Sequence, residues 1–214
     1  MAFTGLNPGE LSSSISSMNE AYNSMYSTVL DESTTFVGGI AGVWGNGNAV
    51  TFASDFQSTI NELLSSITEI FESINSSLNS AGAEWNSANN SNTFSSVAFS
   101  ANTGVVDASG IQNNIGGAEG MDATQVTTIT STLCNNILSG VSEACTAAKS
   151  AVSGAAAFLG GSQQSNLISS LNSVTTSIST AVNQIESDIE DVTGQNVEVN
   201  TEVESKVSTA FSGE

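Results

Sequence analysis

The sequence has no histidine, and its lysines and arginines number only 2 against 21 acidic residues. Histidine is the usual general base near neutral pH and the most common protein ligand of transition metals. Without it, the chain lacks a Cys–His nucleophile pair and the usual zinc site. The sequence also lacks a Walker loop, a dinucleotide-binding fingerprint and a calcium loop. We therefore expect no catalytic residue, no metal and no cofactor.

The shortage of basic residues bears on partners as well. The formal net charge is −19, yet charged residues are only 11% of the chain, so Ser, Thr, Asn and Gln must cover most of the surface. A protein that binds nucleic acid needs lysines and arginines that displace the counterions of the phosphates. DNA, RNA and anionic lipid headgroups are therefore excluded as expected partners, and other proteins remain.

Long hydrophobic runs are missing too. The longest apolar stretch, residues 36–45, is about half of the roughly 20 residues that span a bilayer. The opening residues lack the positive region and the apolar region of a secretory signal. We expect no permanent membrane span, and we expect a secreted or cell-surface protein to be exported without a signal peptide.

The two cysteines, Cys134 and Cys145, fall within one predicted helix. At 1.5 Å per residue they lie on one face but about 16 Å apart, too far for a disulfide. We interpret both as small buried apolar residues.

A helical hairpin is predicted for residues 1–90. Apolar residues recur every three or four positions over residues 7–43 and again from Phe52 to Trp85, with a cluster of turn formers between them. The start is marked by Asn7 as a cap, by the only proline at position 8, and by Glu10 as a capping-box partner. Two long amphipathic helices joined by a short turn are expected to lie antiparallel.

A second hairpin is predicted for residues 121–194. Asp122 caps its first helix with Gln125 as the reciprocal residue, and Gly194 closes its last helix. Residues 91–120 are rich in Gly, Asn and Ser and are expected to form an irregular connector, while residues 195–214 form a tail or a short helix. The short apolar patches of the connector are expected either to pack along the bundle or to form a brief hairpin; they comprise Phe94, Val97, Phe99, Val105 and Val106. The predicted fold is an all-α, antiparallel four-helix bundle made of two tandem hairpins.

The two halves also resemble each other. At a constant offset of 111 residues, the apolar stripe of the second predicted helix matches that of the fourth, and the helix–turn–helix order is shared. The matched positions are Ile60, Leu63, Ile67, Ile70, Ile74 and Leu78 with Leu171, Val174, Ile178, Ala181, Ile185 and Ile189.

The residues around Trp44 carry a family resemblance. Trp44 is followed by Gly45, Asn46 and Gly47, and Ala49 and Phe52 come soon after. This segment resembles the WXG100 (ESAT-6-like) family, small helical hairpins exported by type VII secretion, in which Trp-x-Gly forms the turn. Asn46 stands at the Gly position, and asparagine tolerates a left-handed backbone better than most residues. A large aromatic residue at this place is also expected to plug the open end of a helical core.

Two further features follow from the resemblance. Phe158 and Gly160 form a Phe-x-Gly version of the same turn in the second half. Because the family forms antiparallel pairs of hairpins, two hairpins in one chain resemble a fused dimer. The family's export signal is an aromatic residue followed four positions later by an acid; Trp85 and Asn89 have the spacing but not the charge.

These observations favour a non-enzymatic, exported helical protein, either a type VII substrate or an export partner, that acts through protein–protein contacts. It would be a monomeric pseudo-dimer or a homo-oligomer. One alternative is a structural subunit of an extracellular filament or surface assembly, and another is a helical pore-forming toxin that inserts residues 36–45. Acids on the fourth predicted helix, such as Glu186 and Glu190, are interpreted as a solvated face rather than an acid/base site.

Overall fold

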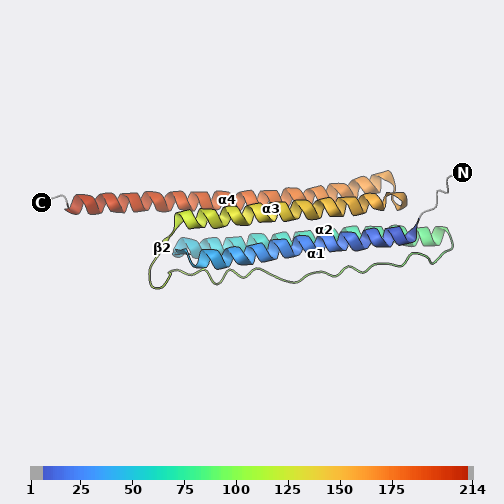
Figure 1. Ribbon diagram of the computed structural model, residues 1–214, viewed down its shortest axis with the longest axis horizontal. Coiled ribbons are helices and arrows are strands. Elements are labelled where there is room, and N and C mark those ends of the chain that lie inside the picture. Colours follow the sequence, from blue (N-terminus) through green and yellow to red (C-terminus); the bar gives the residue numbers. More distant parts are fainter. Residues whose placement is uncertain (1–6, 212–214) are drawn as a thin grey trace. The chain divides into compact units, whose positions relative to one another are not determined.

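The computed structural model describes residues 7–211, except the side chains of residue 157 and of residues 196–211. Four long helices carry nearly all of the regular structure in this part, so the prediction of an all-α fold is confirmed (Figure 1). In chain order, the elements are α1 (Pro8–Ala41), β1 (Trp44–Gly45), α2 (Gly47–Ala88), β2 (Gly120–Met121), α3 (Ala123–Gly154), the 3-10 helix η1 (Ala156–Phe158) and α4 (Gly161–Phe211).

The predicted helix starts are confirmed at both hairpins. The Asn7 side chain accepts a hydrogen bond from the Gly9 amide at 3.0 Å, and the Asp122 carboxylate accepts one from the Gln125 amide at 3.0 Å. Such caps satisfy amides that have no partner within the helix. The partners Glu10 and Gln125 meet the side chain of their cap rather than its backbone N–H.

The expected end of the last helix at Gly194 is wrong. α4 continues through Gly194 to Phe211, and the residues expected as a tail or a short helix belong to this one helix. Glycine ends a helix when it adopts a left-handed conformation, and the left-handed glycines of the described chain do not include Gly194. A glycine inside a helix costs only about 1 kcal/mol, which is not enough to stop a helix whose neighbours continue it.

Buried side chains on all four helices follow one spacing, with steps of four, three and four residues. This 11-residue repeat has 3.67 residues per turn, close to the 3.6 of a straight α-helix, so the apolar stripe drifts little around the helix. The spacing explains why Phe71 and Val182 are buried, whereas Ile70 and Ala181, which we predicted in the stripe, are only half-buried.

The repeat between the halves extends to the first helix of each hairpin. Buried positions at this spacing in α1 have buried counterparts in α3 115 residues later, from Leu11 with Val126 to Ile40 with Ala155. Those of α2 have counterparts in α4 111 residues later, such as Phe71 with Val182. Because the offset falls from 115 residues for the first helix to 111 for the second, the second hairpin has four residues fewer at its turn.

The chain divides into two compact units, and each takes segments from all four helices. The first unit contains α1 up to Leu30, residues 61–105 and residues 137–179. The second contains residues 31–60, residues 106–136 and α4 from Thr180.

Each unit is held by contacts within and between the hairpins. In the first unit, the Tyr22 ring lies 5.6 Å from the Phe71 ring, and a methyl of Thr28 lies against Gly140. In the second unit, the Phe36 and Phe56 rings are 4.7 Å apart, and the Asn136 amide donates to the Glu32 carboxylate at 2.8 Å. The apolar stripes of α1 and α2 therefore face each other, and both hairpins contribute to each unit.

Candidate functional site

The turn of the first hairpin is built around Trp44. This side chain is fully buried, and its ring lies 5.3 Å from the Phe52 ring, which stacks on Phe56 at 5.8 Å. The indole therefore fills the end of the core between α1 and α2, as expected for a large aromatic residue at a hairpin turn.

Asn46 has a role that sequence reasoning did not assign. Its Oδ1 accepts hydrogen bonds from the Trp44 indole N–H at 3.1 Å and from the Ala49 amide at 3.0 Å. It is therefore the N-cap of α2 and also the partner of the buried indole. The expected left-handed backbone is absent, since Asn90 is the left-handed non-glycine residue of the described chain. Asn46 is thus placed by its own side-chain bonds, to the indole and to the first turn of α2.

Gly45 is required by close packing against the connector. β1 pairs antiparallel with β2, and a Cβ at Gly45 would lie 2.7 Å from Ile115 Cγ1 and 2.8 Å from the carbonyl carbon of Asn114. The Asp122 amide also donates to the Val43 carbonyl at 2.8 Å. The first hairpin turn is therefore fastened to the start of α3. A Cβ at Gly47, by contrast, would meet nothing within 4 Å.

The second turn differs from the first. Phe158 ends η1 and is half-buried, and its ring lies edge-on to Trp85 at 6.4 Å. Gly160 precedes α4, and its amide donates to the Gln163 side chain at 2.9 Å. The structure thus brings Phe158 to Trp85 in the first unit, while the Trp44 turn belongs to the second unit.

Trp85 and Asn89 lie where α2 ends. The Asn89 side chain donates to the Trp85 carbonyl at 2.9 Å. Asn90 is left-handed with φ 47°, and the Ser91 amide donates to the Asn86 carbonyl at 2.9 Å, which is the Schellman arrangement. Asn89 is exposed and helps to satisfy the last carbonyls of the helix.

Residues 91–105 form a strap, which runs as an extended chain along α1 and α2 within the first unit (Figure 1). Packing along the helices was one of the two alternatives expected for its apolar patches, but its hydrogen bonds were not expected. Asn79 donates to the Val97 carbonyl at 2.9 Å and accepts from the Val97 amide at 2.8 Å. Asn86 makes the same pair of bonds with the backbone of Phe94, at 2.9 and 3.1 Å. Side-chain amides of α2 thus bond the strap as a neighbouring β-strand would.

Side chains of α1 bond the strap as well. Asn19 donates to the Ala98 carbonyl at 3.1 Å, and the Tyr22 hydroxyl accepts from the Asn102 amide at 2.8 Å. The Tyr26 hydroxyl donates to the Gly104 carbonyl. Burial of this phenol raises the pKa of Tyr26, which keeps it protonated as a donor.

A regular spacing in the sequence marks the residues of α2 that contact the strap. Asn75, Asn79, Gly82 and Asn86 follow the same steps of four, three and four residues as the buried stripe. All but Gly82 bond the strap, and the Phe94 ring lies against Gly82. In this protein, the row of asparagines on α2 therefore marks the side chains that bond the strap.

Ionisable groups form no reactive centre in the part of the chain described. Both cysteines are free and buried, as predicted, and burial together with the charge of Glu186 raises the pKa of the Cys134 thiol to about 12. Among the described residues, no group of three or more Cys, Asp or Glu side chains is placed to hold a metal ion. Over the same residues, no helix is long and apolar enough to cross a bilayer.

Comparisons with known proteins give no relatives. No family model, curated protein or solved structure matches the chain.

Proposed function

We propose that the chain is an exported helical protein of the WXG100 type, a type VII secretion substrate or the partner exported with one, and that it acts by protein–protein contact. The observation that supports this most directly is the Trp44 turn. Trp44 is buried at the hairpin end and bonded to Asn46, the residue at the family's Gly position. An ordered turn at this tryptophan is what the family resemblance implies, and it supports the proposal.

The internal repeat supports a monomer that is equivalent to a pair of hairpins. The family resemblance implies pairing of hairpins, and here both hairpins contribute segments to each compact unit. Light scattering after size-exclusion chromatography is expected to give the mass of one 21.8 kDa chain. Concentration-dependent polymers would instead favour a filament subunit.

The chemistry of the surface supports binding rather than catalysis. The sequence has no histidine to act as a general base near neutral pH, and burial raises the pKa of the Cys134 thiol to about 12, which keeps it protonated. Partner proteins are then recognised by shape and hydrogen bonding.

Export can be tested in a bacterium with a type VII secretion system and in its isogenic strain without the secretion ATPase. The epitope-tagged chain is expected in the medium of the first strain only, with a cytoplasmic enzyme as the control for lysis. Equal release from both strains, or retention in both, would overturn the proposal.

The Trp85 and Asn89 pair offers a variant in the same assay. Asn89→Asp restores the acid of the export signal, and we expect it to increase ATPase-dependent release. The change also removes a donor to the Trp85 carbonyl and adds negative charge at a helix C-terminus, which costs about 0.5–1 kcal/mol. Ser87→Asp, at an exposed position in the last turn of the same helix, is the control for added charge.

A further inference from the structure

The second hairpin carries a counterpart of the groove that holds the strap. The offsets of the internal repeat place Thr127 at the position of Ser12, Glu190 at that of Asn79, and Thr193 at that of Gly82. In the first hairpin, Ser12 donates to the Ser95 carbonyl, and Asn79 and Gly82 contact Val97 and Phe94. All three positions therefore face an extended chain in one half of the protein.

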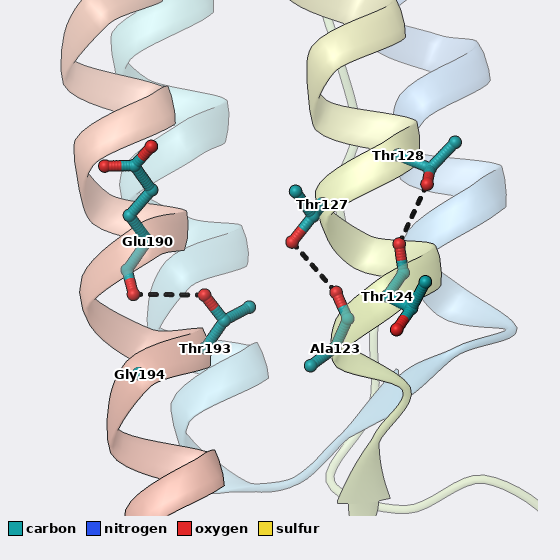
Figure 2. A pocket seen from close by; sticks show the side chains of 7 residues that line it. All are labelled: Ala123, Thr124, Thr127, Thr128, Glu190, Thr193 and Gly194. Atoms are coloured by element: carbon teal, nitrogen blue, oxygen red, sulfur yellow. Dashed lines mark hydrogen bonds between the residues drawn. The ribbon is translucent and has the colours of Figure 1, made fainter.

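In the second hairpin, the three equivalents line an open groove of about 730 Å³. It lies between the start of α3 and residues 190–194 of α4, and all of its lining residues belong to the second unit (Figure 2). Of the residues that the structure describes, those lining this groove include none from residues 91–120. The counterpart of a strap-binding surface is thus open to a ligand.

The hydrogen-bonding character of the two grooves differs. Asn79 both donates to the strap and accepts from it. In the second groove, the Thr127 hydroxyl donates to the Ala123 carbonyl at 2.9 Å, and the Thr193 hydroxyl lies 3.0 Å from the Glu190 carbonyl (Figure 2). The Thr193 hydroxyl also lies 2.8 Å from the Ile189 carbonyl, to which it donates. Each of these hydroxyls then has only lone pairs to offer. Glu190 is exposed and, when ionised, accepts only.

The residues that differ between the two hairpins at these positions indicate which extended chain the second groove can bind. Phe94 of the strap needs the space above Gly82, and Thr193 fills that space in the second hairpin. The strap of a second copy is therefore a poor occupant. Because the hydroxyls of Thr127 and Thr193 and the carboxylate of Glu190 all offer acceptors, the groove favours a chain that brings hydrogen-bond donors. With a net charge of −19, the protein also attracts cationic partners.

We propose that the groove at Thr127, Glu190 and Thr193 binds an extended segment of a partner protein that carries lysine or arginine. Backbone N–H groups of the segment donate to the threonine hydroxyls, and a cationic side chain pairs with Glu190. This binding goes beyond the proposed export role and does not depend on it, because it is measured on the purified chain.

The probe is a fluorescein-labelled octapeptide of alternating valine and lysine, a composition that favours extended chains, with the valine–glutamate octapeptide as its counterpart. Anisotropy titrations are expected to show binding of the lysine peptide only. Glu190→Gln is expected to weaken binding about fivefold, as loss of one charge-assisted hydrogen bond implies. Glu143→Gln, at an exposed site on α3 outside the groove, makes the same change in net charge and is expected to alter binding less than twofold.

Amide shifts of the labelled protein locate the peptide. Changes centred on residues 123–128 and 190–194 support the site. Equal weakening by both variants, equal binding of the two peptides, or shifts centred elsewhere would each show that only general charge attraction is present, and would overturn the proposal.

Discussion

The ring of Phe94 occupies the space that a side chain at Gly82 would need. A Cβ built at Gly82 would collide with three atoms of this ring. Phe94 is buried, and Asn86 bonds its backbone on both sides. The pair fixes where the strap begins along α2, and so it sets the register of the bonds that follow.

Gly82→Ala is expected to lower the free energy of unfolding. Alanine gains up to about 1 kcal/mol of helix propensity, but displacing a packed ring costs about 1–3 kcal/mol. Gly38→Ala is the matched control, since a Cβ at this exposed helical glycine meets nothing within 4 Å and should stabilise the protein. Urea denaturation of both variants checks this; stabilisation by both would mean that Phe94 is not seated at Gly82.

Removal of the Asn79 amide tests the strap bonds directly. Asn79→Ala removes the partner of the Val97 amide and one of the two donors to the Val97 carbonyl, which keeps its bond to Asn75, and we expect a loss of about 1–3 kcal/mol. Hydrogen exchange at the Val97 amide should accelerate by more than that of amides in the helix cores. Asn135→Ala, at an exposed site on α3, should change neither quantity appreciably.

The hairpins were predictable because their signals are local. Caps such as Asn7 and Asp122 and apolar residues three or four positions apart are visible in the sequence alone. The hydrogen bonds of the strap were not, because most partners of its backbone lie on another element; Asn102, for example, bonds Tyr22, 80 positions earlier. The end of α4 was predicted wrongly for a different reason. Glycine is a common sign of a helix end in a sequence, but Gly194 within the helix costs only about 1 kcal/mol.

The candidate site was predicted less well than the fold. Trp44 occupies the expected place at the turn, but the contribution of Asn46 depends on a side-chain bond to the indole that no spacing rule shows. Phe158 and Trp85 were identified for separate reasons, and only the structure shows that their rings meet.

Two variants separate the two roles of Asn46, the cap of α2 and the partner of the Trp44 indole. Asn46→Ala and Asn46→Gly both remove the partner of the Trp44 indole, but glycine is tolerated at an N-cap and alanine is not. We expect Asn46→Ala to be less stable than Asn46→Gly by about 0.5–1.5 kcal/mol in urea denaturation followed by tryptophan fluorescence. Equal stabilities would show that capping contributes little here.

Ser33 is a site where a smaller side chain should help. Its hydroxyl is fully buried without a hydrogen-bond partner, and its counterpart in the internal repeat is the buried Ala148. An unsatisfied buried hydroxyl costs about 1–3 kcal/mol, so Ser33→Ala is expected to raise the free energy of unfolding by about 1 kcal/mol. Ser65→Ala, at an exposed position of α2, should stay within about 0.5 kcal/mol of the parent. A loss on Ser33→Ala would reveal a partner for the hydroxyl.

Cys134 should make stability fall at high pH. Its pKa rises from 9.0 to about 12 on folding, through burial and then the charge of Glu186. When the folded state has the higher pKa, the unfolded chain loses its proton first as the pH rises. The stabilisation is therefore complete below the pKa of the unfolded chain, and it is lost as the pH rises from that value towards the pKa of the folded chain. The free energy of unfolding of the parent chain should therefore fall more steeply between pH 9 and 11 than that of Cys134→Ala. Tyr26 titrates in both chains, so its contribution cancels in the difference. Parallel curves in urea denaturation over this range would mean that the thiolate forms as readily in the folded chain as in the unfolded one.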